Sequence, residues 1–113
     1  MSEKPLTDYS NFDALDVSVG TIIKAEPFRE ARKPAYVLFI DFGEHGILKS
    51  SAQITDNYKL DELINSQVVA VVNFPDKQVA NLMSQCLVLG VLTGEGVVLL
   101  RPDKKVENGS KIA

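Results

Sequence analysis

The stretch YVLFIDFGEHGILKSSAQI, from Tyr36 to Ile54, decides the fold. Its first part is apolar on both faces of an extended chain until Asp41, which is typical of a strongly buried strand. A turn bounded by glycines, GEHG, separates this strand from a second one, ILKSSAQI. Side chains of a strand alternate between its two faces. One face of the second strand therefore carries a polar stripe of Lys49, Ser51 and Gln53.

Further strand-like runs lie on both sides of this pair. The first run, at 17–25, places Val17, Val19, Ile23 and Ala25 on one face, and Gly20 indicates a bend or bulge where backbone passes close. Three more runs follow the polar stripe, at 67–73, 86–92 and 95–102.

Two short helices complete the expected elements. The segment at 9–16 reads as an N-terminal helix with Asn11 as its N-cap, and a second helix is expected within 55–66. There is no βαβ alternation and no internal repeat. A helix between the third and fourth of five or six short strands favours a small closed barrel. We predict an all-β fold, an OB-fold five-stranded barrel with a short N-terminal helix and C-terminal extension strands.

Length and composition are those of one domain, which we place at 1–113 with a helical extension at 1–16 and a C-terminal extension at 93–113. The single cysteine, Cys86, allows no intramolecular disulfide and is expected to be a buried small hydrophobe. Neither a secretory signal nor an apolar run long enough to span a membrane is visible. We therefore expect a cytoplasmic protein without membrane insertion.

The sequence offers little for catalysis or for holding a metal. His45 is the only histidine, and we expect it to be exposed in a glycine-flanked turn. No ligand cluster, nucleophile motif or glycine-rich phosphate loop occurs. We predict no enzyme activity, no metal and no cofactor.

The basic residues are locally concentrated, although the formal net charge is −3. An overall negative charge argues against a strong nucleic-acid-attracting field, but a local basic face is compatible with it. In an OB-fold, ligands lie on the face of strands two and three and in the flanking loops. The loop between strands one and two would present Arg29, Arg32 and Lys33. The segment NFPDKQVANLMS would overhang the same face as a long loop, adding Asn73, Lys77, Gln78 and Ser84.

These residues also admit a structural interpretation. Asn73, Ser51 and Ser84 can satisfy backbone groups where the barrel closes. Leu82 and Met83 can be core residues or, if exposed, an adaptable apolar lip suited to peptides. Phe28 and Tyr36 flank the basic loop and can stack on an unpaired base, or Tyr36 can be buried.

Four segments together resemble the tRNA-binding-domain family: VGTIIKAEPFREARKPAYVLFIDFG, KSSAQI, VVAVVNFPDKQVANLMSQCLVLGV and VLLRPD. The same domain is attached to methionyl- and phenylalanyl-tRNA synthetases, and the resemblance runs from about Phe12 to Ile112. It implies an OB-fold homodimer in the cytoplasm. It also implies structure-selective binding of tRNA and an export-related chaperone role toward unfolded or preprotein segments.

The sequence departs from the family pattern at two positions. Asn81 stands where the family often has glycine, and asparagine tolerates the left-handed backbone that such a turn needs. Asp76 stands where a basic or neutral residue would help bind phosphate, which predicts weaker RNA binding.

Three functional hypotheses follow. The first is tRNA binding by Arg29, Arg32, Lys33, Lys49, Ser51, Gln53, Asn73, Lys77, Gln78 and Ser84. The second is a peptide-binding secretion chaperone that uses Phe28, Leu82 and Met83 and has no physiological RNA ligand. The third is a structural dimerisation module based on the apolar strand VVLLRP.

Overall fold

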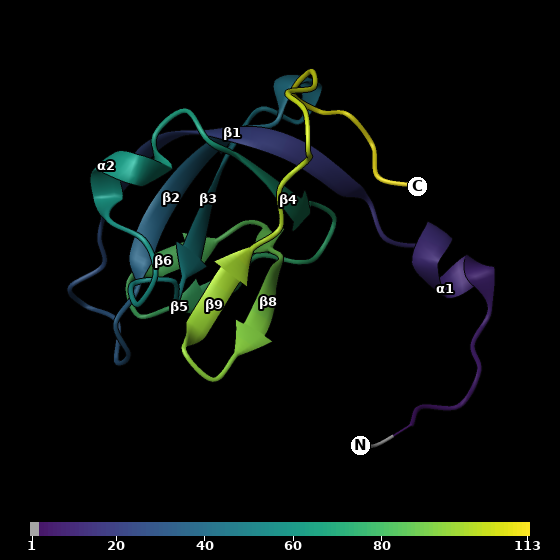
Figure 1. Cartoon of the computed structure of the whole chain (residues 1–113), viewed down its shortest axis with the longest axis horizontal. Coiled ribbons are helices and arrows are strands. Elements are labelled where there is room, and N and C mark those ends of the chain that lie inside the picture. The colour runs from purple at the N-terminus through teal and green to yellow at the C-terminus, as the bar shows by residue number, and fades with distance from the viewer. Residues whose placement is uncertain (1–2) are drawn as a thin grey trace.

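The computed structural model describes residues 3–113. Five strands form one antiparallel sheet in the order β3-β2-β1-β4-β7, and two small hairpins, β5–β6 and β8–β9, are attached to it (Figure 1). The strands are β1 (Val17–Pro27), β2 (Tyr36–Asp41), β3 (Ile47–Ala52), β4 (Gln67–Val71), β5 (Lys77–Val79), β6 (Leu82–Ser84), β7 (Leu87–Val88), β8 (Gly90–Thr93) and β9 (Gly96–Leu99). The helical segments are α1 (Tyr9–Asp13), η1 (Gly43–His45) and α2 (Leu60–Leu63).

The sheet curls into a nearly closed barrel, and the predicted all-β, OB-type fold is confirmed. β2 and β3 pair in register around the η1 turn, as the opening stretch of sequence indicates. β2 is apolar on both faces because both are covered. Leu38 and Ile40 point into the main core, whereas Val37 and Phe39 pack against the loop that precedes the strand. The helix α2 lies between β3 and β4 and buries Leu63 completely in the main core.

The first strand follows the predicted alternation only in its first half. Its pairing with β2 shifts between Ile22 and Lys24, which marks a bulge at Ile23. One extra residue reverses the alternation. Before the bulge, Ile22 points into the main core, and Ile23 lies on the side of Val17 and Val19, where it is 43% exposed. After the bulge, Ala25 packs against the main core, so the prediction that Ala25 shares the face of Val17 was wrong. The close approach expected at Gly20 is present, because a Cβ there would lie 2.7 Å from Ile40 Cγ2.

Polar groups close the gap between the edge strand β3 and the chain before β7. The Gln85 backbone N–H donates to the Lys49 carbonyl at 2.7 Å, and the Lys49 N–H donates to Gln85 Oε1 at 2.9 Å. The Ser51 N–H donates to Ser84 Oγ at 3.1 Å, and the Ser50 hydroxyl donates to the Cys86 carbonyl at 3.2 Å. The edge of the barrel is thus satisfied through the backbone of Lys49 and Ser51, and the side chains of the predicted polar stripe take no part in these bonds.

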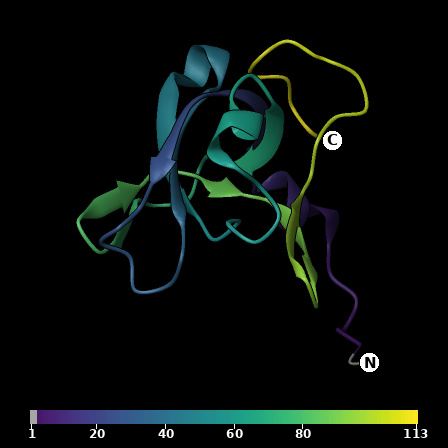
Figure 2. The same cartoon turned by 60° about the vertical axis from the view of Figure 1, so that its left-hand side comes forward.

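Both chain ends run along the outside of the barrel. α1 begins after Asp8 rather than at the predicted cap Asn11, and it buries none of its side chains. Both views place it at the periphery, away from the barrel (Figures 1 and 2). The C-terminal segment pairs with the first half of β1, through Ser18 and Lys111, and covers a second small core of β1 and β4 residues.

The segment 73–84 is a hairpin rather than the long loop expected from sequence. β5 and β6 pair with Val79 opposite Leu82, so Ala80 and Asn81 form a two-residue turn. The residue with left-handed backbone is Ala80, at φ 51°, and not Asn81 as the family pattern suggests. The apolar pair Val79 and Leu82 packs on the β1–β2 loop, which fixes the hairpin against the barrel.

Candidate functional site

An open cleft lies between three parts of the chain: the β1–β2 loop, the outer face of β3 and the segment from Phe74 to Gln78. It consists of two adjoining cavities of about 1000 and 640 Å³ that share Arg32, Ser51, Gln53 and Val79. The sequence placed a ligand site on this face, and the structure forms a cavity there. The larger cavity is lined by Arg32, Ser51, Gln53, Phe74, Pro75, Lys77, Gln78, Val79, Ser84, Cys86 and Leu87.

The charged side chains that line this cleft are cationic, although the exposed Asp76 lies in the same Phe74 to Gln78 segment without lining either cavity. Arg32, Lys33 and Lys77 line the cleft, and no carboxylate is among the described residues that do so. The protein as a whole has a formal net charge of −3, so the cleft is a local exception. Cations in a hollow face with low-dielectric walls concentrate positive potential there. The cleft therefore favours an anionic ligand.

Seven of the predicted RNA-binding residues line the cleft: Arg32, Lys33, Ser51, Gln53, Lys77, Gln78 and Ser84. Gln78 and Ser84 are partly engaged within the protein, because Gln78 Nε2 donates to the Ala80 carbonyl at 3.2 Å and Ser84 Oγ accepts from Ser51. Gln53 is exposed, and its amide has no hydrogen bond to another described residue.

Lys49 and Arg29 do not join this cleft. Lys49 lines a smaller cavity near the tip of the β5–β6 hairpin, together with Glu26 and Glu30, two carboxylates that offset its charge. Arg29 is exposed in the β1–β2 loop but lines neither part of the cleft. The prediction that Lys49 joins Lys77 and Gln78 in one cleft is not supported by its position, and the role of Arg29 as a phosphate contact in the β1–β2 loop stays a prediction.

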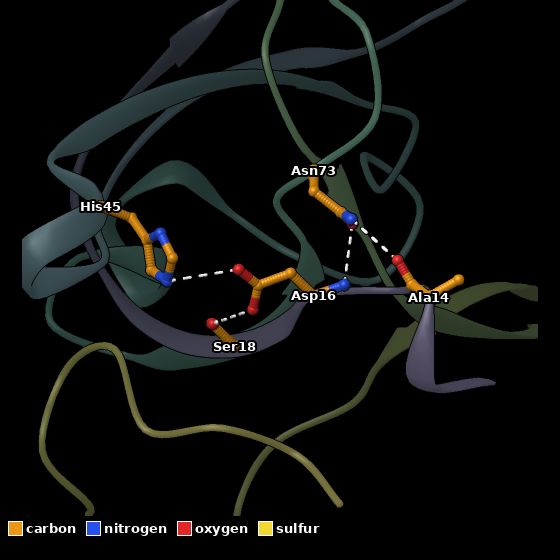
Figure 3. A network of polar contacts seen from close by, with 5 residues as sticks. All are labelled: Ala14, Asp16, Ser18, His45 and Asn73. Atoms are coloured by element: carbon orange, nitrogen blue, oxygen red, sulfur yellow. Dashed lines mark hydrogen bonds and ion pairs between the residues drawn. The ribbon is translucent and has the colours of Figure 1, made fainter. Parts of the chain in front are cut away.

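Asn73 also lies outside the cleft, because its amide is used by the N-terminal segment. Its Nδ2 donates to the Ala14 carbonyl at 2.9 Å, and its Oδ1 accepts from the Asp16 N–H at 2.7 Å. The side-chain carboxylate of Asp16 lies 3.7 Å from His45 Nε2 and accepts a hydrogen bond from the Ser18 hydroxyl (Figure 3). Asn73 therefore clamps the chain before β1 to the end of β4, which is the structural role that the sequence left open for it.

The three predicted peptide-binding residues do not form one lip. Phe28 is 6% exposed and packs with Ala35 and Val37, so its side chain is buried. Leu82 is half-buried against the same cluster. Only Met83 is exposed, at 45%, and it does not line the cleft.

The apolar part of the cleft comes from residues that were not among the predicted site residues. Phe74 is 43% exposed and Leu87 is 49% exposed, and both line the larger cavity beside Pro75. A signal for Phe74 was present: it falls in the polar run NFPDKQ, outside any strand alternation. An aromatic residue in such a run has no core position to explain it.

Cys86 forms part of the floor of the cleft and is buried, as expected. Burial raises the pKa of its thiol from 9.0 to about 12, and a hydrogen bond with Ser50 opposes this in part. The thiol is therefore protonated and unreactive at neutral pH.

The described residues, 3–113, contain no group of three or more side chains suited to bind a metal ion. Within the same residues, no helix has the length and apolarity that crossing a membrane requires.

Comparison with known proteins places this chain within a family. The model of the putative tRNA binding domain matches residues 17–111, and the chain belongs to this family. The structure is similar to chaperone CsaA from Bacillus anthracis, with 49% identity, TM-score 0.92, and coverage of 96% of this chain and 100% of the other. It is equally similar to CsaA from Picrophilus torridus, with 55% identity, TM-score 0.91 and the same coverage.

A second group of relatives is much longer. The methionine–tRNA ligase of Pyrococcus abyssi is 36% identical over 104 residues, which cover 92% of this chain and 14% of the ligase. The chain thus spans about one seventh of the ligases that it matches. The family resemblance inferred from sequence is confirmed.

Proposed function

We propose that this protein is a non-enzymatic, structure-selective tRNA-binding protein that uses the cleft described above. The observation that carries the proposal is the charge of the cleft lining: three cations and no carboxylate among the described residues, in a chain of net charge −3. Membership of the tRNA-binding-domain family supports the same conclusion.

Each polar residue has a distinct part in this proposal. Arg32, Lys33 and Lys77 contact phosphates, and the free Gln53 amide donates to or accepts from a base or ribose. Phosphate contacts position the RNA, and groups such as Gln53 add selectivity. Because the cations are few, binding is weak, and because the attraction is electrostatic, the affinity falls as salt is added.

The test is a titration with labelled tRNA at several salt concentrations between about 50 and 200 mM. Three phosphate contacts give a log–log slope of about −2 to −3 for the unsubstituted protein. The double variant Arg32→Ala/Lys33→Ala is expected to flatten this slope by about 1 to 2.

A matched control is the double variant Lys104→Ala/Lys105→Ala, which removes the same charge from an exposed segment that does not line the cleft. It is expected to leave the slope within about 0.5 of the parent value. If both double variants flatten the slope equally, the attraction is a general charge effect and the cleft is not the tRNA site.

A second candidate function is binding of unfolded or preprotein segments, as the name chaperone given to CsaA suggests. The exposed apolar residues Phe74 and Leu87 on the cleft rim favour it. Such binding should persist in salt and show a negative heat-capacity change. The variant Leu87→Asp should abolish it, and retention of peptide affinity in this variant would contradict a peptide site in the cleft.

We further propose that the protein is a cytoplasmic homodimer with an export-related role. The β8–β9 hairpin projects from the barrel and carries exposed apolar side chains, with Leu92 at 85% and Val91 at 48% (Figures 1 and 2). These two side chains are consecutive in β8 and lie on opposite faces of the hairpin, and exposed apolar surface of this kind is typical of an interface. Leu92→Asp should convert a dimer to a monomer in sedimentation equilibrium, and a parent protein that is monomeric at high concentration would contradict the proposal.

A further inference from the structure

Phe74 differs from the other aromatic residues in having a free ring inside the cleft. Phe28 and Phe42 are buried. The Tyr36 hydroxyl donates to the Tyr58 carbonyl at 2.7 Å, so its ring is fixed by that bond.

Two further rings are already covered by cations. Lys24 Nζ lies 5.0 Å from the centre of the Phe39 ring, and the Arg101 guanidinium lies 5.6 Å from that of Tyr58. The remaining aromatic residues, Tyr9 and Phe12, belong to α1, which lies outside the barrel. Among the described residues that line the cleft, Phe74 is the one aromatic side chain, and it is 43% exposed.

The backbone on both sides of Phe74 is held in place. The preceding residue, Asn73, uses both ends of its amide to bind Ala14 and Asp16. The following residue, Pro75, has a fixed φ and restricts Phe74 to extended backbone. The strand β5 begins two residues later, at Lys77. A ring carried on backbone held in this way costs little backbone entropy to position when a flat ligand packs against it.

The groups around Phe74 are those that a nucleotide requires. Arg32 and Lys77 line the same cavity and can contact a phosphate. The Gln53 amide offers both a donor and an acceptor to a base edge. The cavity, at about 1000 Å³, lies at the upper end of the range found for small-molecule sites.

We propose that Phe74 is the stacking platform for one unpaired nucleotide of the bound RNA, with an adjacent phosphate held between Arg32 and Lys77. This inference rests on the proposed tRNA-binding function and names the part of the RNA that enters the cleft. A paired base has its faces covered by neighbouring bases, so only a single-stranded segment, loop or end can present a free face.

The charges decide between RNA and peptide as the occupant of this subsite. An apolar peptide side chain would need the ring but would gain nothing from the cations beside it. A nucleotide uses both, because every base has a π face and every linkage carries a negative charge. The cleft has no carboxylate among its described lining residues that would repel that charge.

A direct test replaces Phe74 by tryptophan, which is possible because the chain contains no other tryptophan. A base stacked on the indole quenches its fluorescence. For Phe74→Trp we expect quenching by a short single-stranded RNA and by tRNA, but not by a blunt RNA duplex. The matched control Met83→Trp places the indole at an exposed position outside the cleft, where no quenching is expected.

A second test measures affinity by fluorescence anisotropy of labelled RNA, without relying on the new indole. Phe74→Leu retains an apolar side chain but lacks a π face. It should weaken binding of single-stranded RNA by about 5- to 150-fold at constant salt. The salt slope should stay unchanged, because no phosphate contact is removed. Thermal unfolding of Phe74→Leu confirms that the variant is folded.

The outcomes separate this inference from the proposed function. If Phe74→Leu binds single-stranded RNA and tRNA with parental affinity and salt slope, the stacking subsite is wrong but the cationic cleft stands. The subsite is also overturned if Phe74→Leu weakens the binding of duplex RNA and of single-stranded RNA equally, or if this variant loses only peptide binding. If the parent protein binds no tRNA at low salt, the proposed function fails, and the subsite fails with it.

Discussion

Gly20 shows how a single residue sets the geometry of the barrel. A Cβ at this position would lie 2.7 Å from Ile40 Cγ2 and also 2.7 Å from Phe42 Cδ1. Both side chains are completely buried in the main core and have no room to move. The absence of a side chain at Gly20 lets β1 lie against the core of β2.

We therefore predict that Gly20→Ala destabilises the protein by about 1–3 kcal/mol through overpacking. Urea denaturation followed by circular dichroism measures the change. Gly94→Ala is the control, because a Cβ at Gly94 would have no atom within 4 Å. Equal effects of the two substitutions would refute the packing explanation.

Cys86 should make the stability of the folded protein depend on pH. Its pKa is about 12 in the folded protein, against an ordinary value of 9.0, because burial disfavours the thiolate. Between these values the unfolded chain releases the thiol proton and the folded chain keeps it. The stabilising contribution of this group is thus complete below pH 9 and is lost as the pH rises toward 12.

The loss should be at most about 1.4 kcal/mol per pH unit. It is measured as the difference in pH dependence between the parent protein and Cys86→Ala, since other groups titrate equally in both. Parallel stability curves between pH 9 and 11 would contradict a buried thiol of raised pKa.

At the scale of elements, sequence patterns predicted pairing better than they predicted local detail. The alternation at 47–54 correctly separated Ser50, Ala52 and Ile54, which are buried, from the polar stripe. It did not predict the bulge at Ile23, because one extra residue in a strand leaves no composition signal. The hairpin β5–β6 was missed because its strands are only three residues each, and its turn lacks the usual glycine.

The same limit applies to the candidate site. The ligand-binding face of an OB-type barrel could be predicted from the sequence, and seven of the predicted RNA-binding residues line the cleft on that face. The sequence could not show that Asn73 and Lys49 lie outside the cleft. The position of Asn73 depends on its hydrogen bonds with Ala14 and Asp16, and Lys49 lies near the tip of the β5–β6 hairpin. These are long-range contacts that no local pattern encodes.

The Asn73 clamp can be tested at this scale. Asn73→Ala removes both hydrogen bonds to the N-terminal segment and should cost about 1 kcal/mol of stability. Hydrogen exchange of the Asp16 amide should become faster, as measured by NMR. Asn81→Ala is the matched control, since Asn81 lies exposed in the hairpin turn. Unchanged exchange at Asp16 in Asn73→Ala would show that the clamp is not needed.

At the scale of the whole molecule, charge distribution matters more than net charge. The chain carries more acidic than basic residues. Among the described residues that line the cleft, however, there is no aspartate or glutamate. Two smaller cavities outside the cleft are each lined by a pair of glutamates: Glu44 and Glu107 in one, Glu26 and Glu30 in the other. A negative exterior around one positive cleft disfavours non-specific attachment elsewhere and directs an anionic ligand to a single site.

Binding of tRNA in this cleft is best tested by following the backbone amide signals in NMR spectra at low salt. On addition of tRNA, the shifts should change at 31–33, at 51–53 and at 74–79, the three segments that form the cleft. Amides of the β8–β9 hairpin and of Lys104 and Lys105 should keep their shifts. Changes confined to those outer segments, or no change at any amide, would contradict the account.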